Sequence, residues 1–552
     1  MKQMLRKFAS VLLVVMMVMS LTPALAQQTV GTREAQPVPE GDWLTPYPTV
    51  VNITTVKGQG MDVVFEPGDD STNNPWTRAW LEKLGIEVTY DWIDDGNTQY
   101  ATKLNMTIAS GNLPDVFKCN YVQFRQLMQA GLLMDITDYY NENLSQRVRD
   151  YEKTDPDTIK LTMEDGRIYG IPGYYYGIID QPKDLWIRKD WYEAAGSPEL
   201  KTIEDYENLV KGFMETYGGY GLAIENKLEN LFMTGPMFGV YLGNPGNTNQ
   251  QYFWYKDDTG RIKAGIAHEE FRTALTYWAK WYEEGILSPD FANFDTNKMI
   301  QDIVNGKVGS QPHYQWQGWH VGPNLVAAQG DEAYFIPFPF PTIDGSQVLG
   351  QVGFPNNDII VISKTCTNPA AVMKLLSYTD YIMFDPNTVL TEEEFKGFTD
   401  GQREHVPGSV EIIDPMADMI QFEHVLHALQ TGDTSELYTA GMQKKYGDSI
   451  SWLNERNSGG LGAYLQQGFE GCSYYNSKFL IDNEFLQRTD AWGPPPEAFD
   501  KTVNTIDIIL NGVMEIIMGV QPVEYYDEVL ASWYAQGGQI MEDAINDVYG
   551  DK

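Results

Sequence analysis

Residues 74–90 read Asn74-Pro-Trp-Thr-Arg-Ala-Trp-Leu-Glu-Lys-Leu-Gly-Ile-Glu-Val-Thr-Tyr90 and predict one helix followed at once by one strand. Asn74 and Pro75 are typical of a helix start, because asparagine caps exposed backbone amides and proline suits the first turn. Gly85 ends the predicted helix, since glycine readily adopts the left-handed backbone found at that position. Residues 86–90 are rich in β-branched and aromatic side chains and predict a strand.

The neighbouring segments continue this alternation of strands and helices. Residues 61–65 predict a strand, residues 100–110 a helix that Gly111 ends, and residues 115–117 a short strand. Strands that alternate with helices favour a parallel sheet with helices packed against it. The fold class that we expect is therefore α/β.

The rest of the chain is long enough for more than one domain. A length of 552 residues exceeds what a single hydrophobic core usually organises, which favours two or three domains. The turn-rich, aromatic stretch 165–190 predicts a domain boundary. Beyond it we expect helices over 203–215, 269–284 and 296–305, a buried strand over 359–362, a helix that begins at Asn368-Pro369, and C-terminal helices over 501–518 and 525–548.

The N-terminus has the layout of a secretory signal peptide. Lys2, Arg6 and Lys7 precede or adjoin an apolar run over residues 8–21, and Ala24-Leu-Ala26 follows as a cleavage site. The run is shorter than the roughly 20 residues that span a bilayer as a helix, so an uncleaved anchor is the weaker alternative. We expect cleavage after Ala26, secretion to a periplasm or the cell surface, and an extended leader over residues 27–48.

The chain is strongly acidic, with a formal net charge of −37. Nucleic-acid binding needs clusters of Lys and Arg, which the sequence lacks, so we expect no nucleic-acid partner. The three cysteines Cys119, Cys366 and Cys472 can form at most one disulfide, and the six scattered histidines give no zinc-binding pattern. We therefore expect no metal and no cofactor.

Motifs of the common hydrolases and nucleotide-binding enzymes are absent from the sequence. It contains no Walker loop, no His-Glu-x-x-His and no Gly-x-Ser-x-Gly. The paired acids Asp69-Asp70, Asp94-Asp95 and Asp257-Asp258 are adjacent in sequence, so their side chains point apart and do not suit a glycosidase pair. Solvated turn charges are the simpler interpretation of these pairs.

Two loops combine aromatic rings with amides and glycines. Gly173-Tyr-Tyr-Tyr-Gly177 brings Tyr174, Tyr175 and Tyr176 into one short stretch, and Trp316-Gln-Gly-Trp-His320 does the same for Trp316 and Trp319. An aromatic face covers the apolar face of a sugar, while amides and carboxylates bind its hydroxyls. The alternative for each ring is packing in the core of the protein, and the residues leave both interpretations open.

Short motifs follow one another in a characteristic order along the chain. They are Asn74-Pro-Trp76, Leu84-Gly-Ile86, Tyr100-x-x-Lys103-Leu104, Ala109-Ser-Gly-Asn-Leu-Pro-Asp-Val116, Gly131-Leu-Leu133, Asp165-Gly-Arg-Ile-Tyr-Gly-Ile-Pro172, Trp186-Ile-Arg-Lys-Asp-Trp191, Trp281-Tyr282-x-x-Gly285, Ile362-Ser-Lys364 with Asn368-Pro369, and Trp533-Tyr-Ala-Gln-Gly-Gly538. From about residue 55 to the C-terminus, the chain resembles family 1 of the extracellular solute-binding proteins, the carbohydrate class, and especially its large oligosaccharide-binding lipoproteins.

The resemblance implies a two-lobed fold of the periplasmic-binding-protein type II class, with hinge segments between the lobes and a ligand cleft between them. Lobe 1 would comprise residues 49–172 and about 357–430, and lobe 2 residues 173–356 and about 431–552. The ligand-binding residues predicted from the loops and the resemblance are Trp76, Asn120, Tyr121, Gln123, Tyr174, Tyr175, Tyr176, Trp316, Trp319 and Trp492.

The function that the resemblance implies is the substrate-binding component of an ABC importer. Such a protein captures an oligosaccharide as a monomer and delivers it to a membrane permease without catalysis. Relatives often carry a lipid-bearing cysteine directly after the signal, but Gln27 stands there, so we expect no lipid anchor. The alternatives are a secreted glycoside hydrolase or lyase and a binding protein for another solute, such as a peptide.

Overall fold

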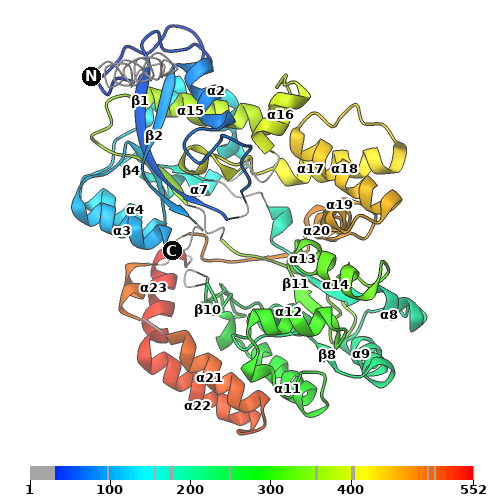
Figure 1. Cartoon of the computed structure of the whole chain (residues 1–552). Coiled ribbons are helices and arrows are strands. Elements are labelled where there is room, and N and C mark those ends of the chain that lie inside the picture. The colour runs from blue at the N-terminus through cyan, green and yellow to red at the C-terminus, as the bar shows by residue number, and fades with distance from the viewer. Residues whose placement is uncertain are drawn as a thin grey trace, which may run out of the picture.

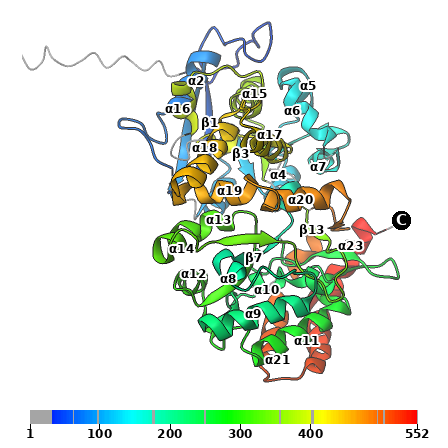
Figure 2. The same ribbon diagram turned by 90° about the vertical axis from the view of Figure 1, so that its right-hand side faces the viewer.

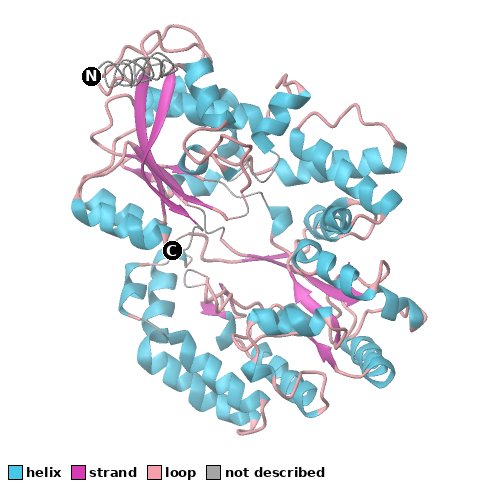
Figure 3. Ribbon diagram, in the orientation of Figure 1, coloured by secondary structure: helices cyan, strands magenta, loops and turns pink. Residues whose placement is uncertain are grey.

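The computed structural model describes residues 31–550, except residues 62, 96–98, 155, 174–177, 248–249, 355–357, 400–404, 494–495 and 503–504. The predicted signal peptide over residues 1–26 and the tyrosines 174–176 lie outside the described residues. Figure 1 shows the described chain as two bodies, one above the other, and Figure 3 shows that each contains strands with helices packed against them. We call the body around strand β1 lobe 1 and the body around strand β7 lobe 2. The α/β, two-lobed fold is thereby confirmed.

Lobe 1 contains a sheet with the strand order β2-β1-β3-β14-β6. Strand β1 pairs in parallel with β2 and β3, whereas β14 runs antiparallel to β3 and β6. The sheet is therefore mixed, and only part of it has the parallel arrangement that the sequence predicts. The strands are β1 (Val51–Gln59), β2 (Ile86–Asp95), β3 (Val116–Cys119), β6 (Ile171–Pro172) and β14 (Ile359–Ile362).

The predicted strand over residues 61–65 is wrong, because β1 lies over residues 51–59 instead. Met61 and Val64 are 88% and 62% exposed and belong to no strand. Strand β1 is difficult to predict because its sequence mixes polar side chains with β-branched ones, as an exposed segment does. In the structure the strand is buried along almost its whole length. Lys57 is an example: its side chain is buried, and its Nζ donates to two backbone carbonyls of neighbouring loops at 3.2 and 3.1 Å.

Helix α2 (Pro75–Leu84) confirms the predicted helix together with both of its ends. The Asn74 side chain accepts hydrogen bonds from the backbone amides two and three residues further on. Gly85 has a φ of 67°, and a Cβ at this position would lie 2.5 Å from the carbonyl oxygen of Tyr47. Glycine is thus needed both for the backbone conformation and for the close approach of the preceding segment.

Strand β14 shows how the sheet of lobe 1 buries both of its faces. Ile360 and Ile362 pack in one apolar cluster with α2 and α15, while Ile359 and Val361 pack in another with α3 and α4. This alternation follows from the two-residue period of a strand. The helices are α3 (Tyr100–Ser110), α4 (Tyr121–Gln129) and α15 (Pro369–Phe384), which confirms the predicted helices at 100–110 and from Pro369.

The described part of the predicted leader, residues 31–48, lies along lobe 1. Thr32 forms a bridge with strand β1, and the guanidinium of Arg33 lies 3.0 Å from the carboxylate of Asp115. The buried Lys374 of α15 donates from Nζ to the carbonyls of residues 42, 43 and 45 at 2.9–3.2 Å. A buried ammonium needs such partners, so this contact fastens the segment to the lobe.

Lobe 2 contains a second sheet, with the strand order β12-β7-β11-β8. Strand β7 runs antiparallel to β11 and β12, and β11 runs parallel to β8. The strands are β7 (Asp184–Arg188), β8 (Tyr220–Leu222), β11 (Val308–His313) and β12 (Phe335–Phe338). The predicted helices of this region are confirmed as α9 (Ile203–Tyr217), α11 (Glu270–Glu283) and α12 (Thr296–Val304).

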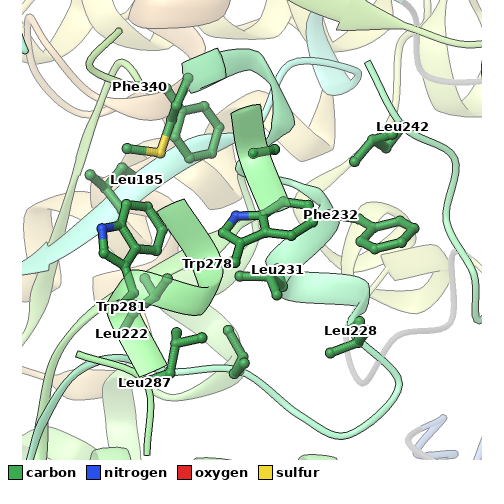
Figure 4. Packing of buried hydrophobic residues seen from close by; sticks show 14 of the residues in the cluster. Leu185, Leu222, Leu228, Leu231, Phe232, Leu242, Trp278, Trp281, Leu287 and Phe340 are labelled. Atoms are coloured by element: carbon green, nitrogen blue, oxygen red, sulfur yellow. The ribbon is translucent and has the colours of Figure 1, made fainter. Parts of the chain in front are cut away.

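The core of lobe 2 is centred on two tryptophans of α11. Figure 4 shows Trp278 and Trp281 among aliphatic side chains and Phe232, and all three aromatic residues are buried. The rings of Trp278 and Phe232 stack with centroids 5.8 Å apart, and the Trp281 Nε1 donates to the Glu207 carboxylate at 2.8 Å. Much of the chain's aromatic content therefore fills its own core.

A group of helices, α17 (Ala417–Thr431), α18 (Ala440–Glu455), α19 (Leu461–Gln467) and α20 (Ser473–Asp482), lies beside both lobes. Figure 2 shows these helices between α15 above and α13 and α14 below. Helix α17 packs against α18, α19 and α20, and α19 packs against α13. Leu461 and Leu465 of α19 join the core of lobe 2. Helix α17 ends at Thr431, next to the lobe boundary predicted near residue 430, which stays a prediction.

The C-terminal helices are α21 (Thr505–Ile517), α22 (Tyr526–Trp533) and α23 (Gln539–Tyr549). The single helix predicted over 525–548 is wrong, because a π-helical turn at Tyr534–Gly538 separates α22 from α23. Gly537 has a φ of 142° within this turn, and a Cβ there would lie 2.9 Å from the Thr502 side chain. The turn directs α23 toward the centre of the molecule (Figure 1).

Helix α16 (Glu392–Thr399) packs on α2 in lobe 1. The chain passes from the sheet of lobe 1 to that of lobe 2 between β6 and β7 and returns between β12 and β14. It leaves lobe 1 again only after the turn Gly408–Val410, which contacts β1 and β3. In the described part of the chain, no helix combines the length and apolar character needed to cross a membrane. The other elements are α5 (Thr137–Asn143), α6 (Gln146–Arg149), α7 (Pro156–Lys160), β4 (Met163–Glu164), β5 (Arg167–Ile168), α8 (Lys189–Ala194), α10 (Glu229–Phe232), β9 (Trp254–Lys256), β10 (Ile262–Ala264), α13 (Gln317–His320), α14 (Gly322–Gln329), β13 (Gly350–Val352) and β15 (Leu486–Arg488).

Candidate functional site

A pocket of about 950 Å³ lies where the two lobes meet. The start of α4 forms its wall on lobe 1, and the segments that pass between the lobes form its back. Loops of lobe 2, helix α20 and the C-terminal helices complete it. A pocket of this size and position, with mixed apolar and polar walls, has the general form of a small-molecule site.

On lobe 1 the pocket is lined by residues that follow strand β3. Asn120 caps α4, because its side chain accepts a hydrogen bond from the backbone amide of Gln123 at 2.9 Å. Tyr121 and Arg125 also line the pocket from this helix. The Gln123 side chain does not line the pocket: it donates to the Asn105 side chain at 2.8 Å, so its predicted ligand role is replaced by a structural one.

On lobe 2 the most prominent wall is a pair of parallel rings. Trp316 is 41% exposed and lines the pocket together with Tyr314. The two ring planes differ by 6°, with centroids 5.9 Å apart, and the edge of His313 supports the indole with centroids 4.3 Å apart. We call Tyr314 and Trp316 the aromatic platform. The exposed indole, parallel to the Tyr314 ring, suits stacking against the apolar face of a sugar ring.

A second aromatic wall comes from helix α20, which the sequence analysis missed. Tyr475 and Phe479 are 40% and 47% exposed, and both line the pocket. Their spacing of four residues places them on one face of the helix. This spacing beside the run Tyr474-Tyr475 was a detectable signal, but only the tertiary structure brings this helix to the aromatic platform.

The deeper part of the pocket is more apolar and belongs to lobe 2 and the C-terminal helices. The Tyr252 hydroxyl lies 2.9 Å from the Thr505 hydroxyl and accepts a hydrogen bond from the Trp533 Nε1 at 2.9 Å. This contact joins α21 and α22 to the pocket wall. The apolar lining residues are Met233, Pro236, Leu242, Phe253, Trp254, Phe340, Val348, Leu349, Phe354, Leu480, Phe499, Met541 and Ile545.

Lys183 adds a positive charge to the pocket. Its Nζ lies 5.1 Å from the centroid of the Tyr314 ring, a cation–π distance. Burial lowers the pKa of Lys183 to about 8, and the carboxylate of Glu229 opposes this effect only in part. Glu229 accepts a hydrogen bond from the Asn244 side chain at 2.7 Å, and both residues line the pocket.

Two buried carboxyls lie where the chain enters lobe 2. Asp184 accepts hydrogen bonds from Ser473 and Asn476 of α20, and burial raises its pKa to about 7. Burial also raises the pKa of Asp180, to about 8. Both carboxyls line the pocket and are wholly or partly protonated near neutral pH.

Asp180 belongs to a larger buried network. The Tyr474 hydroxyl lies 2.6 Å from Asp180 Oδ1 and 2.7 Å from Asp418 Oδ2. A phenol has one proton to donate, so a carboxyl proton must complete the second of these hydrogen bonds. Gln315 donates to Asp180 at 3.0 Å and accepts from Gln466 at 2.6 Å. The network joins the segment after β6 to α17, α19 and α20.

Several tryptophans predicted as ligand contacts lie elsewhere. Trp76 is fully buried in lobe 1, where it packs on Phe398 with centroids 4.6 Å apart, so its predicted role in the pocket is wrong. Trp319 lies outside the pocket as well: its ring contacts Gly462 of α19, and the Lys445 ammonium lies 3.9 Å from its centroid. In both cases packing against the protein's own helices takes the place that the prediction gave to a ligand.

Trp492 has an intermediate position. It does not line the pocket itself, but its ring lies 5.6 Å from that of Phe354, which does. It therefore supports a pocket residue from behind. The predicted contacts Tyr174, Tyr175 and Tyr176 lie outside the described residues. Of the predicted residues, the structure brings together Asn120, Tyr121 and Trp316 in one pocket.

The described residues contain no group of three or more His, Cys, Asp or Glu side chains arranged to hold a metal ion. Cys119, Cys366 and Cys472 are each buried and free, so they form no disulfide with one another.

Comparisons with known proteins agree with this arrangement. Residues 66–379 match the model of the bacterial extracellular solute-binding proteins, and the chain belongs to this family. Lipoprotein LipO of Bacillus subtilis is 23% identical over 522 residues, which cover 89% of this chain and 91% of the relative.

Solved structures share the fold over nearly the whole chain. An HMO-binding, ABC-transporter-associated solute-binding protein from Bifidobacterium longum infantis has a TM-score of 0.61 at 13% identity and covers 91% of this chain and 99% of its own. The alginate-binding protein AlgQ2 has a TM-score of 0.57 at 16% identity and covers 92% of this chain and all of its own. At these identities the likeness concerns the fold.

Proposed function

We propose that this protein captures an oligosaccharide in the pocket between its lobes and presents it to the permease of an ABC importer. The observation that carries the proposal is the aromatic platform of the half-buried Tyr314 and the exposed Trp316, which lines a pocket of about 950 Å³. Rings on one wall and amides such as Asn120 and Asn244 on the others match the two faces of a sugar. Structural relatives whose names refer to alginate and to HMO binding support a sugar as ligand.

Ligand capture would work through closure of the lobes. Asn120 and Tyr121 belong to lobe 1, whereas Tyr314 and Trp316 belong to lobe 2, so a sugar between them would contact both lobes only in a closed form. A ligand shifts the equilibrium toward the closed form only by its differential affinity for that form. The permease would then recognise the closed, loaded monomer.

We propose that the protein does not turn its ligand over. Three carboxyls of the described residues line the pocket, and each is engaged by the protein. Asp180 is engaged by Tyr474 and Gln315, Asp184 by Ser473 and Asn476, and Glu229 by Asn244. A glycoside hydrolase needs an acid and a second carboxylate that both face the scissile bond. A catalytic role would require these groups to leave their present partners.

The test is a binding assay followed by product analysis on the mature chain. Calorimetric titration with a panel of oligosaccharides should give stoichiometric binding of at least one member, and chromatography after long incubation should recover it intact. New reducing ends over many turnovers would favour the hydrolase alternative instead. Binding of peptides, with no sugar bound, would contradict the proposed ligand class.

We also propose export with cleavage between Ala26 and Gln27. The charged start, the apolar run over residues 8–21 and the small residues before the site support it. Intact-mass measurement of exported protein should give the mass of the unmodified chain from Gln27. A retained N-terminal segment, or a lipid adduct, would contradict this proposal.

A further inference from the structure

Lys183 is a charged side chain of the pocket for which the described part of the chain provides no counterion. It precedes strand β7 and lines the pocket. Within the described residues, no ion pair or hydrogen bond reaches its Nζ, whose contact is with the face of the Tyr314 ring 5.1 Å away. The Lys183 side chain is half-buried. Partial removal of an ammonium from water without an ion-pair partner is unfavourable, and a cation–π contact offsets only part of this loss.

The other charged groups that line the pocket do not neutralise Lys183. They are Arg125 from α4, Glu229 from α10, and Asp180 and Asp184 from the segment that carries Lys183 itself. Burial raises the pKa of Asp180 to about 8 and that of Asp184 to about 7, so near neutral pH Asp180 is mostly protonated and Asp184 is ionised only in part. Glu229 acts on Lys183 too weakly to prevent its pKa from falling to about 8. Arg125 and Lys183 thus place two cationic side chains in the pocket of a chain whose net charge is −37.

We infer that the sugar bound in this pocket carries a carboxylate, as a uronic acid residue does, and that the Lys183 ammonium is its binding partner. This inference rests on the proposed function and specifies its ligand class.

The geometry allows a single sugar residue to meet both features. Tyr314 lies next to Lys183 and is also one half of the aromatic platform with Trp316. A pyranose stacked on the platform can direct a carboxylate at its ring edge toward the ammonium. A charge-assisted hydrogen bond of this kind is roughly twice as strong as one to a neutral hydroxyl, and it gives the half-buried ammonium an anionic partner.

The experiment compares short oligosaccharides in matched pairs, each uronic acid form beside its carboxyl-reduced neutral form. Calorimetric affinities are measured on the mature protein and on three variants. Lys183→Met removes the charge and keeps an unbranched side chain, and Lys183→Arg keeps the charge. Lys201→Met is the control for a lost positive charge, because Lys201 lies outside the pocket and its side chain is 65% exposed beside Glu199.

We expect the acidic member of at least one pair to bind about tenfold or more tightly than its neutral form. Lys183→Met should weaken binding of that acidic member by about 10- to 100-fold and leave the neutral form nearly unchanged. Lys183→Arg should retain the preference for the acid, and so should Lys201→Met.

Two results would overturn the inference while the proposed function stands. One is that neutral members bind as tightly as their acidic forms. The other is that Lys183→Met, still folded by its melting curve, keeps the full preference for the acid. If no oligosaccharide of either kind binds, the proposed function itself fails, so the two failures are distinguishable.

Discussion

At the scale of single residues, Trp316 and Trp76 show how differently two tryptophans can be used. Both were predicted to contact the ligand. Trp316 keeps 41% of its surface exposed on the pocket wall, whereas Trp76 of α2 is fully buried and packs on Phe398. The same substitution at the two sites should therefore separate ligand binding from stability.

Trp316→Ala should weaken ligand binding by roughly 30-fold. Stacking an indole on a sugar face is worth on the order of 2 kcal/mol, and each 1.4 kcal/mol corresponds to a factor of ten. Calorimetric titration and a melting curve on the same preparation would measure both properties. A large fall in melting temperature with unchanged affinity would show that the platform does not bind the ligand.

Trp76→Ala should have the opposite profile. Removing a fully buried tryptophan leaves a cavity and should lower the free energy of unfolding by about 3–5 kcal/mol. Because Trp76 does not line the pocket, the folded fraction should keep its affinity. Denaturant unfolding followed by fluorescence would measure the loss, and a stability like that of the unaltered protein would contradict the core position of Trp76.

Residue-scale prediction from the sequence was limited by this ambiguity. Trp316 could be predicted as a ligand contact because it follows a strand within a loop of glycine and amides. Trp319 shares that loop and Trp76 follows the helix start Asn74-Pro75, yet segments distant in the chain cover both rings. Tyr475 and Phe479 share one face of α20, a pattern visible in the sequence, but only tertiary packing places that face in the pocket. Lys183 reaches the pocket through tertiary packing with no local pattern that identifies it.

At the scale of elements, the contact of α13 with α19 depends on a glycine. A Cβ on Gly462 would lie 2.4–2.5 Å from three atoms of the Trp319 ring, well inside van der Waals contact. The absence of a side chain therefore lets the indole pack on the helix backbone. Gly447 on the neighbouring α18 is exposed, and a Cβ added there would have no other atom within 4 Å. Gly447 is therefore a matched control for Gly462.

Gly462→Ala should destabilise the protein by about 1–3 kcal/mol, because the added methyl forces the Trp319 ring or the helix to move. Gly447→Ala should instead stabilise it by up to about 1 kcal/mol, since alanine favours an exposed helix more than glycine does. Thermal unfolding of the two variants would measure the difference. Equal melting temperatures would contradict the tight contact between Trp319 and α19.

Element-scale prediction succeeded where the chain marks its own boundaries. Helix α2 begins after an asparagine cap and ends at Gly85, and the structure has both ends where the sequence predicts them. The sequence does not predict strand β1, because its buried Lys57 and threonines are residue types that are usually exposed. The break between α22 and α23 was missed because Gly537 lies within an otherwise continuous helical pattern.

At the scale of the whole molecule, the network around Tyr474 connects parts that are distant in the chain. Asp180 lies in the segment that enters lobe 2 after β6, while Asp418 and Tyr474 lie on α17 and α20. Because Asp180 and Gln315 also line the pocket, the network reaches the ligand site. The protonation state of this network should consequently affect the free energy of unfolding.

The stability contributed by Asp180 should fall as the pH rises. Burial raises the pKa of this carboxyl from its ordinary value of 3.8 to about 8 in the folded protein. The folded state therefore binds a proton that the unfolded state lacks, and this contribution is complete below about pH 4 and lost as the pH rises through about 8.

The variant Asp180→Asn is the control, because its amide has no such proton to lose. The quantity to follow is the unfolding free energy of the unaltered protein minus that of the Asn variant. This difference should decline by up to about 1.4 kcal/mol per pH unit between about pH 5 and pH 8. Melting curves of both proteins across this range would measure the decline. A difference that stays constant, or grows with pH, would contradict a buried, protonated Asp180 at the junction of the lobes.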